Sequence, residues 1–224
     1  MSTTLPPPGK KGYRGLAMEG FLARWYARTT AKNLTDYRKS AEAVAAHVPN
    51  GGSVLEVAPG PGYLAIELAK LGPYRVVGLD ISRSFVRMAT ENATRAGVTA
   101  TFQHGDAAAM PFDGDSFDFI VCRAAFKNFA EPVRALAEMH RVLRPGGKAL
   151  ILDLRPDASP EAIAAHVKGM GLGWINALMT RWILHVLLKW AYSQRQFLDM
   201  ASQTPFKTCE IREEPLGLAV SLVK

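Results

Sequence analysis

Apolar and polar positions follow three different patterns along this chain, and each pattern predicts a different kind of structure. From about residue 19 to residue 48, apolar residues recur at the three- to four-residue spacing of helices. Between residues 50 and 155, short apolar runs alternate with helical stretches. Residues 157–192 return to a mostly helical pattern that is rich in Trp and Leu. The middle part is typical of a parallel sheet with helices on both faces.

The apolar runs and the turn residues between them predict the individual elements. The predicted strands are residues 53–56, 75–79, 99–102, 117–122, 148–154, 209–214 and 217–223, and the predicted helices between them are residues 64–70, 84–97, 132–143 and 194–202. Ser84 is placed to cap the second of these helices. Only Pro215 and Leu216 join the last two strands, which is enough for an antiparallel hairpin but not for a parallel crossover. The fold class is therefore α/β: a Rossmann-like, seven-stranded, mostly parallel sheet with an antiparallel last strand, helices on both faces and a helical lid insertion.

The same patterns predict the organisation of the whole chain. Residues 1–15 are rich in proline and basic residues and are expected to form a flexible arm. Residues 16–224 are expected to form a single domain, since 224 residues with 48% hydrophobic side chains support one substantial core. Within that domain, residues 16–48 form an N-terminal helical cap and residues 157–192 form a helical insertion.

Positive charge is concentrated near the N-terminus. Residues 1–40 contain eight Lys and Arg against Glu19 and Asp36, so this stretch carries +6 of the formal net charge of +7. Such a stretch can meet anionic lipid, nucleic acid or an acidic substrate, although a solvated basic face is the simpler interpretation. Two cysteines do not make a disulfide framework, and we expect a cytoplasmic protein.

Residues 172–192 have the length of a membrane span but not its composition. Arg181, His185 and Lys189 interrupt the stretch at four-residue intervals, which makes one helical face basic. We interpret the stretch as amphipathic.

The first predicted strand ends in Glu56 and passes through a bend of glycine and proline into a helix. A helix N-terminus presents unpaired backbone N–H groups, and a ligand can approach the main chain closely at Gly60 and Gly62. A carboxylate at a strand end accepts hydrogen bonds only. The turn therefore suits an adenosine-like ligand that carries cationic or N–H groups.

Two further strands also end near a carboxylate. Asp80 follows the second strand, where it can hold ribose hydroxyls, and Asp106 follows the third, where it can accept from an adenine amino group. The glycines also fit the relaxed dinucleotide pattern. Three strand-end carboxylates nevertheless favour a site for an adenosine-containing ligand without a pyrophosphate over a nicotinamide dinucleotide site, because carboxylates would repel a pyrophosphate.

A set of motifs in a fixed order carries a family resemblance. They are Glu56-Val-Ala-Pro-Gly-Pro-Gly62, Val77-Gly-Leu-Asp80, Gly105-Asp-Ala-Ala-Ala-Met-Pro-Phe112, Ser116-Phe-Asp-Phe119 and Arg141-Val-Leu-Arg-Pro-Gly-Gly147. Together they resemble the class I S-adenosylmethionine-dependent methyltransferases over roughly residues 50–155. Phe126-Lys127-Asn128-Phe129 is similar to the ubiquinone/menaquinone-type C-methyltransferases, which carry Arg-Asn at Lys127-Asn128. One departure is Ala58, where the family usually has glycine, and a slightly tighter loop is expected there.

The resemblance implies a role for each cofactor residue. Glu56 lies near the methionine amino group, beside the backbone of Ala58, Pro59, Gly60 and Gly62. Asp80 binds the ribose, Ile81 packs on the adenine, and Asp106 with the Ala107 amide reads the adenine edge. Arg123 falls where the pocket opens toward the acceptor. The implied cofactor is S-adenosyl-L-methionine, with S-adenosyl-L-homocysteine as product.

Candidates for catalysis and acceptor binding come from the residues around this site. Tyr26 and Arg123 are the catalytic candidates, because Tyr26 can close over the cofactor and Arg123 can orient an anionic acceptor. The candidate substrate contacts are Phe126, Lys127, Trp174 and Met179. No Cys/His cluster has zinc spacing, so no metal is expected.

Residues 157–192 have three interpretations. Trp174, Leu178 and Trp182 share one helical stripe, which fits a helix packed on the sheet edge, a lid over a hydrophobic acceptor, or an interfacial helix on an anionic membrane.

The predicted function is transfer of a methyl group to a small hydrophobic or aromatic acceptor by in-line displacement. The sequence leaves open an adenosyl-cofactor-binding protein without methyl transfer. It also leaves open a nucleic-acid methyltransferase, although the Asn/Asp-Pro-Pro-aromatic tetrapeptide is missing after the fourth strand. The expected partner is a small-molecule acceptor, nucleic acid is disfavoured, peripheral membrane contact stays open, and the oligomeric state is not predicted.

Overall fold

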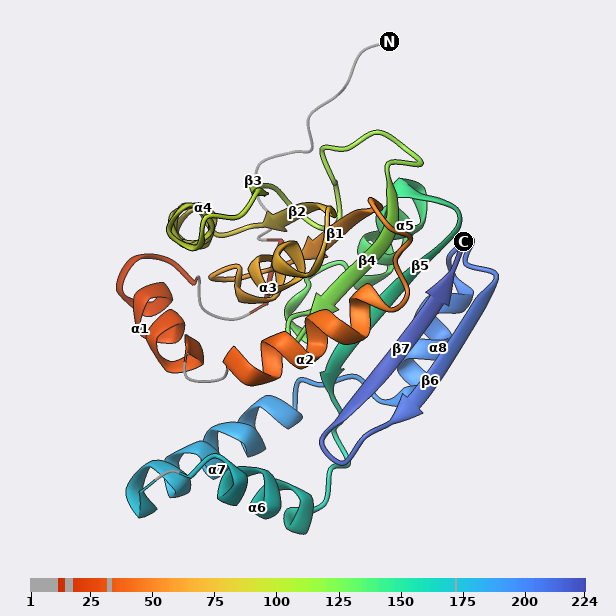
Figure 1. Ribbon diagram of the computed structural model, residues 1–224. Helices are drawn as coiled ribbons and strands as arrows, with labels where there is room; N and C mark the ends of the chain where they lie inside the picture. The colour runs from red at the N-terminus through yellow and green to blue at the C-terminus, as the bar shows by residue number, and fades with distance from the viewer. Residues whose placement is uncertain (1–11, 15–17, 32–33, 172) are drawn as a thin grey trace.

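The computed structural model describes residues 12–14, 18–31, 34–171 and 173–224. Seven strands form one sheet in the order β3-β2-β1-β4-β5-β7-β6 (Figure 1). They are β1 (Ser53–Val57), β2 (Arg75–Asp80), β3 (Ala100–His104), β4 (Phe117–Arg123), β5 (Leu143–Leu154), β6 (Thr208–Glu213) and β7 (Gly217–Val223). The first five strands pair in parallel, and β7 runs antiparallel to both β5 and β6. This arrangement confirms the predicted fold class.

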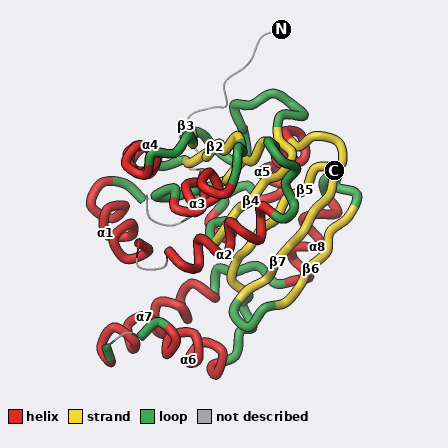
Figure 2. Tube along the Cα trace, viewed as in Figure 1, coloured by secondary structure: helices red, strands yellow, loops and turns green. Residues whose placement is uncertain are grey.

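Alternation along the central strands separates two hydrophobic cores, one on each face of the sheet. In β1, Val54 faces a core shared with α2 (Leu34–Ala45) and α3 (Tyr63–Leu71), whereas Leu55 faces a core shared with α5 (Pro132–Val142) and α8 (Gln194–Ser202). In β4, Phe119 and Ile120 divide in the same way. Figure 2 shows the helices on both sides of the sheet. Side chains that alternate at a period of two are expected to serve both faces of a covered parallel sheet.

Two local predictions are corrected by the structure. Helix α4 (Arg83–Ala96) is capped by Ser82, whose Oγ accepts from the Phe85 N–H at 3.1 Å, and not by Ser84. The Ser84 hydroxyl instead accepts from the N–H of Gly20, at the start of α1 (Gly20–Thr30), at 3.0 Å. Strand β5 begins at Leu143, five residues before the predicted start, and its pairing with β4 is irregular there.

The N-terminal part and the insertion lie outside the sheet. The helical pattern before residue 48 forms the two helices α1 and α2, and residues 157–192 contain α6 (Pro160–Gly169) and α7 (Trp174–Leu188). In Figure 1, α6 and α7 form a pair that stands apart from the sheet, beyond the ends of β4 and β5. Among the described residues, no helix combines the length and the apolar character needed to cross a bilayer. Most of the predicted arm, residues 1–15, lies outside the described residues.

Candidate functional site

The ends of β1, β2 and β3 meet at one edge of the sheet. The Ala58 N–H, just past β1, donates to the Leu79 carbonyl at 2.8 Å, and the Gly105 N–H, just past β3, donates to the Asp80 carbonyl at 3.0 Å. These bonds exist because the three strands are parallel neighbours and their carboxyl ends therefore reach the same edge. The three predicted strand ends consequently form one continuous surface.

Glu56 is a buried carboxylate that forms no ion pair with any cation of the described residues. Its side chain is 3% exposed, and Oε2 accepts from the Ala65 N–H in the first turn of α3 at 2.9 Å. Burial raises the pKa of Glu56 to about 8; Asp80 adds to the shift, and the Arg123 guanidinium opposes it. A cationic group bound beside Glu56 would restore the ionised form.

The loop between β1 and α3 holds three residues in the left-handed region: Ala58 at φ 58°, Gly60 at 55° and Gly62 at 79°. Gly60 donates its N–H to Asp80 Oδ2 at 3.0 Å. A Cβ added at Gly60 would meet only Tyr26 Cε1, at 3.9 Å, so there is room beside the backbone of this buried glycine. The left-handed conformation of Ala58 explains why glycine is usual at that position, since only glycine adopts it without strain.

Asp80 is held in place by backbone donors. Oδ2 accepts from Gly60 as described, and Oδ1 accepts from the Ser82 N–H at 2.8 Å. Burial raises the pKa of Asp80 to about 6, while the hydrogen bonds from Ser82 and Gly60 oppose that shift. Each carboxylate oxygen has a second lone pair, so Asp80 can still accept from a ligand hydroxyl.

Asp106 and Ile81 lie under a segment that the sequence did not place at the site. Asp106 Oδ1 accepts from the Ala108 N–H at 2.9 Å, beside Ala107. A Cβ at Gly12 would overlap the Asp106 carboxylate and lie 2.6 Å from Ile81 Cδ1, so only glycine allows this close approach. The Arg14 N–H donates to the Asn128 carbonyl at 2.6 Å, which attaches residues 12–14 to the loop after β4.

The two catalytic candidates, Tyr26 and Arg123, both lie near Tyr37. The Arg123 guanidinium lies over the Tyr37 ring, with Cζ 4.6 Å from the ring centroid. Tyr26 lies against Gly60, and burial raises the pKa of Tyr26 to about 12. Tyr26 is therefore protonated at neutral pH and can donate a hydrogen bond there, but it cannot serve as a base. Tyr37 was not predicted, because its contact with Arg123 joins residues far apart in the sequence.

The structure does not bring the four substrate candidates together. Phe126 is fully buried in an aromatic cluster with Phe129 and Phe197, and Lys127 is 3% exposed. Trp174 and Met179 project from α7 into solvent. Contact of each of the four with the acceptor stays a prediction.

Lys127 forms a buried ion pair that sequence reasoning missed. Its Nζ lies 2.9 Å from Asp153 Oδ1 and donates to the Ala124 carbonyl at 2.7 Å. The Lys127 N–H also donates to Asp153 Oδ2 at 2.8 Å. Asp153 lies on β5, 26 residues away in sequence, so no local pattern could reveal the pair.

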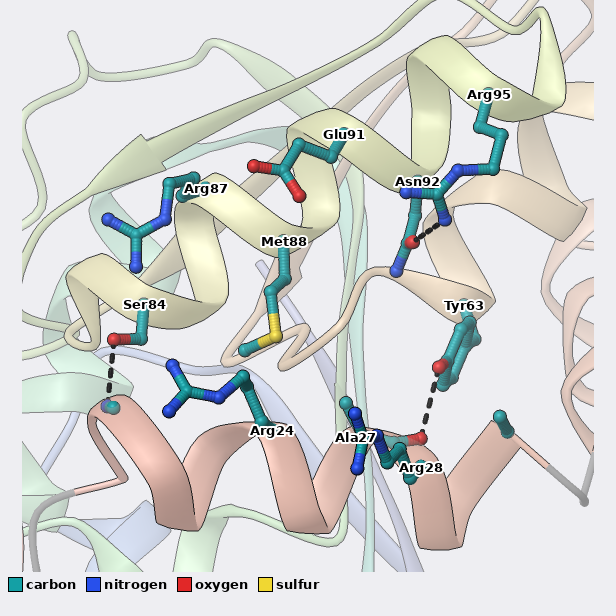
Figure 3. A pocket seen from close by; sticks show the side chains of 12 residues that line it. Arg24, Ala27, Arg28, Tyr63, Ser84, Arg87, Met88, Glu91, Asn92 and Arg95 are labelled. Carbon is teal, nitrogen blue, oxygen red and sulfur yellow. Dashed lines mark hydrogen bonds between the residues drawn. The ribbon is translucent and has the colours of Figure 1, made fainter.

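Two cavities lie near this edge of the molecule. One, of about 390 Å³, lies between α1 and α4, as Figure 3 shows, with arginines on both helices. The other, of about 350 Å³, is lined by Arg14, Lys189, Trp190, Ala191, Tyr192 and Gln196. Tyr192 packs on Phe126 and Phe197, and its hydroxyl is the one buried side-chain polar atom without a partner among the described residues. In that part of the chain, no group of three or more His, Cys, Asp or Glu could hold a metal ion.

Comparison with known proteins agrees with this geometry. A family model described as a methyltransferase domain matches residues 55–151. The demethylmenaquinone methyltransferase of Deinococcus radiodurans is 36% identical over 163 residues, which are 69% of this chain and 67% of that protein. The ubiquinone/menaquinone biosynthesis C-methyltransferase UbiE of Bdellovibrio bacteriovorus is 40% identical over 106 residues, which are 46% of this chain and 44% of that protein. The crystal structure of a SAM-dependent methyltransferase from Aquifex aeolicus matches with a TM-score of 0.68 at 18% identity, over 90% of this chain and 96% of that one.

The strand order and the carboxylates at adjacent strand ends define an α/β protein of the adenosyl-cofactor-binding class. The likeness to the Deinococcus protein is extensive enough to show the family: the chain belongs to the class I S-adenosylmethionine-dependent methyltransferases of the ubiquinone/menaquinone C-methyltransferase type. Its cofactor is S-adenosyl-L-methionine. The aligned stretch covers two thirds of the Deinococcus protein and under half of the UbiE protein, so the likeness carries the activity but not the acceptor.

Proposed function

We propose that this methyltransferase transfers the methyl group to a small aromatic acceptor of the quinol class. The observation that carries the proposal is the likeness to the Deinococcus protein, and an open depression of about 350 Å³ beside Tyr192 is the candidate acceptor site. Its volume lies at the lower end of the range of small-molecule pockets. The relatives named above act on demethylmenaquinone or in ubiquinone and menaquinone biosynthesis, which fits an aromatic acceptor of this size.

The residues at the ends of β1 to β3 fit the cofactor. The buried Glu56 carboxylate lacks a cation, and the methionine ammonium group would supply one. Asp80 would accept from the ribose hydroxyls, and Ile81 would pack on the adenine. Asp106 and the Ala107 amide would read the adenine edge, and residues 12–14 would cover it.

Bound S-adenosylmethionine supplies an electrophilic methyl group on a sulfonium centre. The chain's contribution is to hold the acceptor in line with that group and to exclude water. Tyr26, which lies against the Gly60 backbone, excludes water from one side of the loop. Arg123 and Tyr37 form a stacked pair near Glu56 that closes another side. An acceptor that arrives ionised has no hydroxyl proton to lose, and methylation at a ring carbon then releases the proton of that carbon to water.

Tyr192 is the residue we assign to the acceptor. Its ring lines the cavity, and the Arg14 guanidinium lies over that ring with Cζ 5.7 Å from the centroid. A buried hydroxyl without a partner costs about 1–3 kcal/mol, and an oxygen of a quinol would satisfy it.

The test is transfer of a labelled methyl group from S-adenosylmethionine to short-chain demethylated quinols. We expect labelled product and equimolar S-adenosylhomocysteine. Tyr192→Phe should raise the KM for the quinol roughly two- to tenfold, the worth of one neutral hydrogen bond, without changing cofactor affinity. The matched control is Tyr74→Phe, since Tyr74 packs against the core on the α2–α3 face of the sheet. Absence of label in quinols and phenols alike would refute the proposed acceptor class.

A further inference from the structure

Helix α7 presents a face of large apolar side chains to solvent. Trp174, Leu178 and Trp182, which are four residues apart along the helix, are 64–79% exposed, and Met179 is 56% exposed beside them. Such contiguous apolar surface is rare on a monomeric soluble domain and marks an interaction site.

All tryptophans of the chain are exposed to solvent. The chain contains four, and all are 46–79% exposed: Trp25, Trp174, Trp182 and Trp190. Tryptophan is highly buried on average in folded proteins. Its apolar ring and N–H donor suit the boundary between a bilayer and water, where it is enriched.

Charge on the same helix has one sign only. Arg181, His185 and Lys189 follow one another at four-residue intervals, and residues 162–198 contain no Asp or Glu. All three side chains are exposed, and none forms an ion pair among the described residues. At 3.6 residues per turn these three positions overlap the stripe of Trp174, Leu178 and Trp182, so the exposed face is apolar toward its N-terminal end and basic toward its C-terminal end.

We propose that α7 docks this enzyme on the surface of an anionic membrane. Trp174, Leu178 and Trp182 enter the region between headgroups and acyl chains, and Arg181 and Lys189 bind the lipid phosphates. A lipid surface is favoured over a second copy of the chain by charge. A symmetric dimer through this face would bring the same basic residues together with no carboxylate to meet them.

Helix α7 lies next to the candidate acceptor cavity, so docking of α7 would also position that cavity relative to the membrane. Lys189 and Trp190, which directly follow α7, also line the cavity of about 350 Å³. A docked α7 would place the rim of that cavity at the membrane surface, where an apolar acceptor is concentrated. The docking goes beyond the proposed acceptor class and does not depend on it, because vesicle binding is measured without cofactor or acceptor.

The test is flotation of the full-length chain with vesicles of phosphatidylcholine alone and of equimolar phosphatidylcholine and phosphatidylglycerol. We expect binding to the anionic vesicles that weakens with salt, and much less binding to the neutral ones. Arg181→Glu should lower the partition coefficient roughly tenfold or more, because each basic residue near an anionic leaflet contributes about fivefold. The double variant Leu178→Ser/Trp182→Ser should also abolish the blue shift of tryptophan fluorescence on vesicle addition.

Matched controls separate docking from loss of the fold. Lys207→Glu on the loop before β6 makes the same change in net charge, and Leu198→Ser on α8 removes another exposed apolar side chain. Both should float like the wild type, and all variants should bind S-adenosylhomocysteine with unchanged affinity. The proposal is overturned if the wild type binds neither vesicle, if the α7 variants float as well as the controls, or if light scattering shows a dimer that the Leu178/Trp182 variant dissociates.

Discussion

Removing the charge of Glu56 should change how cofactor binding depends on pH. Burial raises the pKa of this carboxyl to about 8, so it is mostly protonated at neutral pH until a cation binds beside it. With that pKa, roughly 3% of Glu56 is ionised at pH 6.5 and about half at pH 8, and affinity for a ligand that needs the ionised form rises about fifteenfold over this interval. Asp80, with a pKa of about 6, has largely ionised by the start of the interval.

Isothermal titration calorimetry of S-adenosylmethionine into the wild type and Glu56→Gln measures this effect. The ligand's own amino group also titrates near pH 8, so the ratio of the two affinities at each pH isolates the contribution of Glu56. We expect the ratio to rise about fifteenfold from pH 6.5 to pH 8, and titrations in buffers of different ionisation enthalpy to show proton release by the wild type only. A ratio that stays flat would mean that Glu56 is not the group that meets the cation.

The raised pKa of Glu56 also determines how the stability of the ligand-free protein depends on pH. A carboxyl whose pKa is raised from 4.5 by folding stabilises the fold fully below about pH 4.5, and this contribution is lost as the pH rises through about 8. The melting temperature of the ligand-free wild type should therefore fall over that interval more steeply than that of Glu56→Gln. Equal slopes in the two proteins would contradict the shift itself.

Three further predictions concern other buried or strained residues. Asp80→Ala should weaken S-adenosylmethionine binding by more than about 1 kcal/mol in calorimetry, whereas the exposed Asp157→Ala should not, and equal affinities would argue against the ribose role. Lys127→Met should lower the free energy of unfolding, measured in urea, by about 3–5 kcal/mol because it leaves Asp153 unpaired. The control Arg38→Met removes an exposed pair with Glu42 and should cost under about 1 kcal/mol. Similar losses of unfolding free energy in the two variants would refute the argument. Ala58→Gly should leave the free energy of unfolding unchanged or raise it by up to about 1 kcal/mol, because glycine adopts a positive φ without strain. The control Ala43→Gly, on the exposed face of α2, should cost about 1 kcal/mol. A clear loss of stability in Ala58→Gly would contradict the inferred backbone strain.

The elements that sequence reasoning predicted well are those with local causes. Ser193 caps the start of α8 and Gly217 marks the start of β7, and the structure has the bounds of both elements where they were predicted. The cap of α4 was misassigned because Ser82 and Ser84 lie on either side of Arg83, the first residue of the helix. Docking of Gly20 on the Ser84 hydroxyl decides between them, and that contact joins residues 64 apart.

Contacts between distant residues account for what the sequence could not show at the site. The strand-end carboxylates could be anticipated, because parallel neighbours must end at one edge of the sheet. Gly12 over Asp106 and the orphan hydroxyl of Tyr192 could not, since both depend on how a loop returns to that edge. Ala58 illustrates a partial success: the departure from glycine was noticed, the structure adds that its φ is positive, and the slightly tighter loop stays a prediction.

Lys127 and Glu56 are two buried ionisable residues near the carboxyl ends of the strands, and the protein surrounds them differently. The buried Lys127 ammonium group contacts Asp153 and donates to the Ala124 carbonyl. Asp153 also accepts from the backbone N–H groups of Lys127 and Leu154, so both charges of the pair are compensated by the protein. Glu56 is buried as deeply, but it has one backbone donor and only a distant guanidinium, and its pKa rises accordingly. Glu56 is therefore mostly neutral at pH 7 in the ligand-free protein, and no buried charge is left without a partner there. A cation bound beside this carboxyl would ionise it, which is the property that the proposed methionine ammonium group would use.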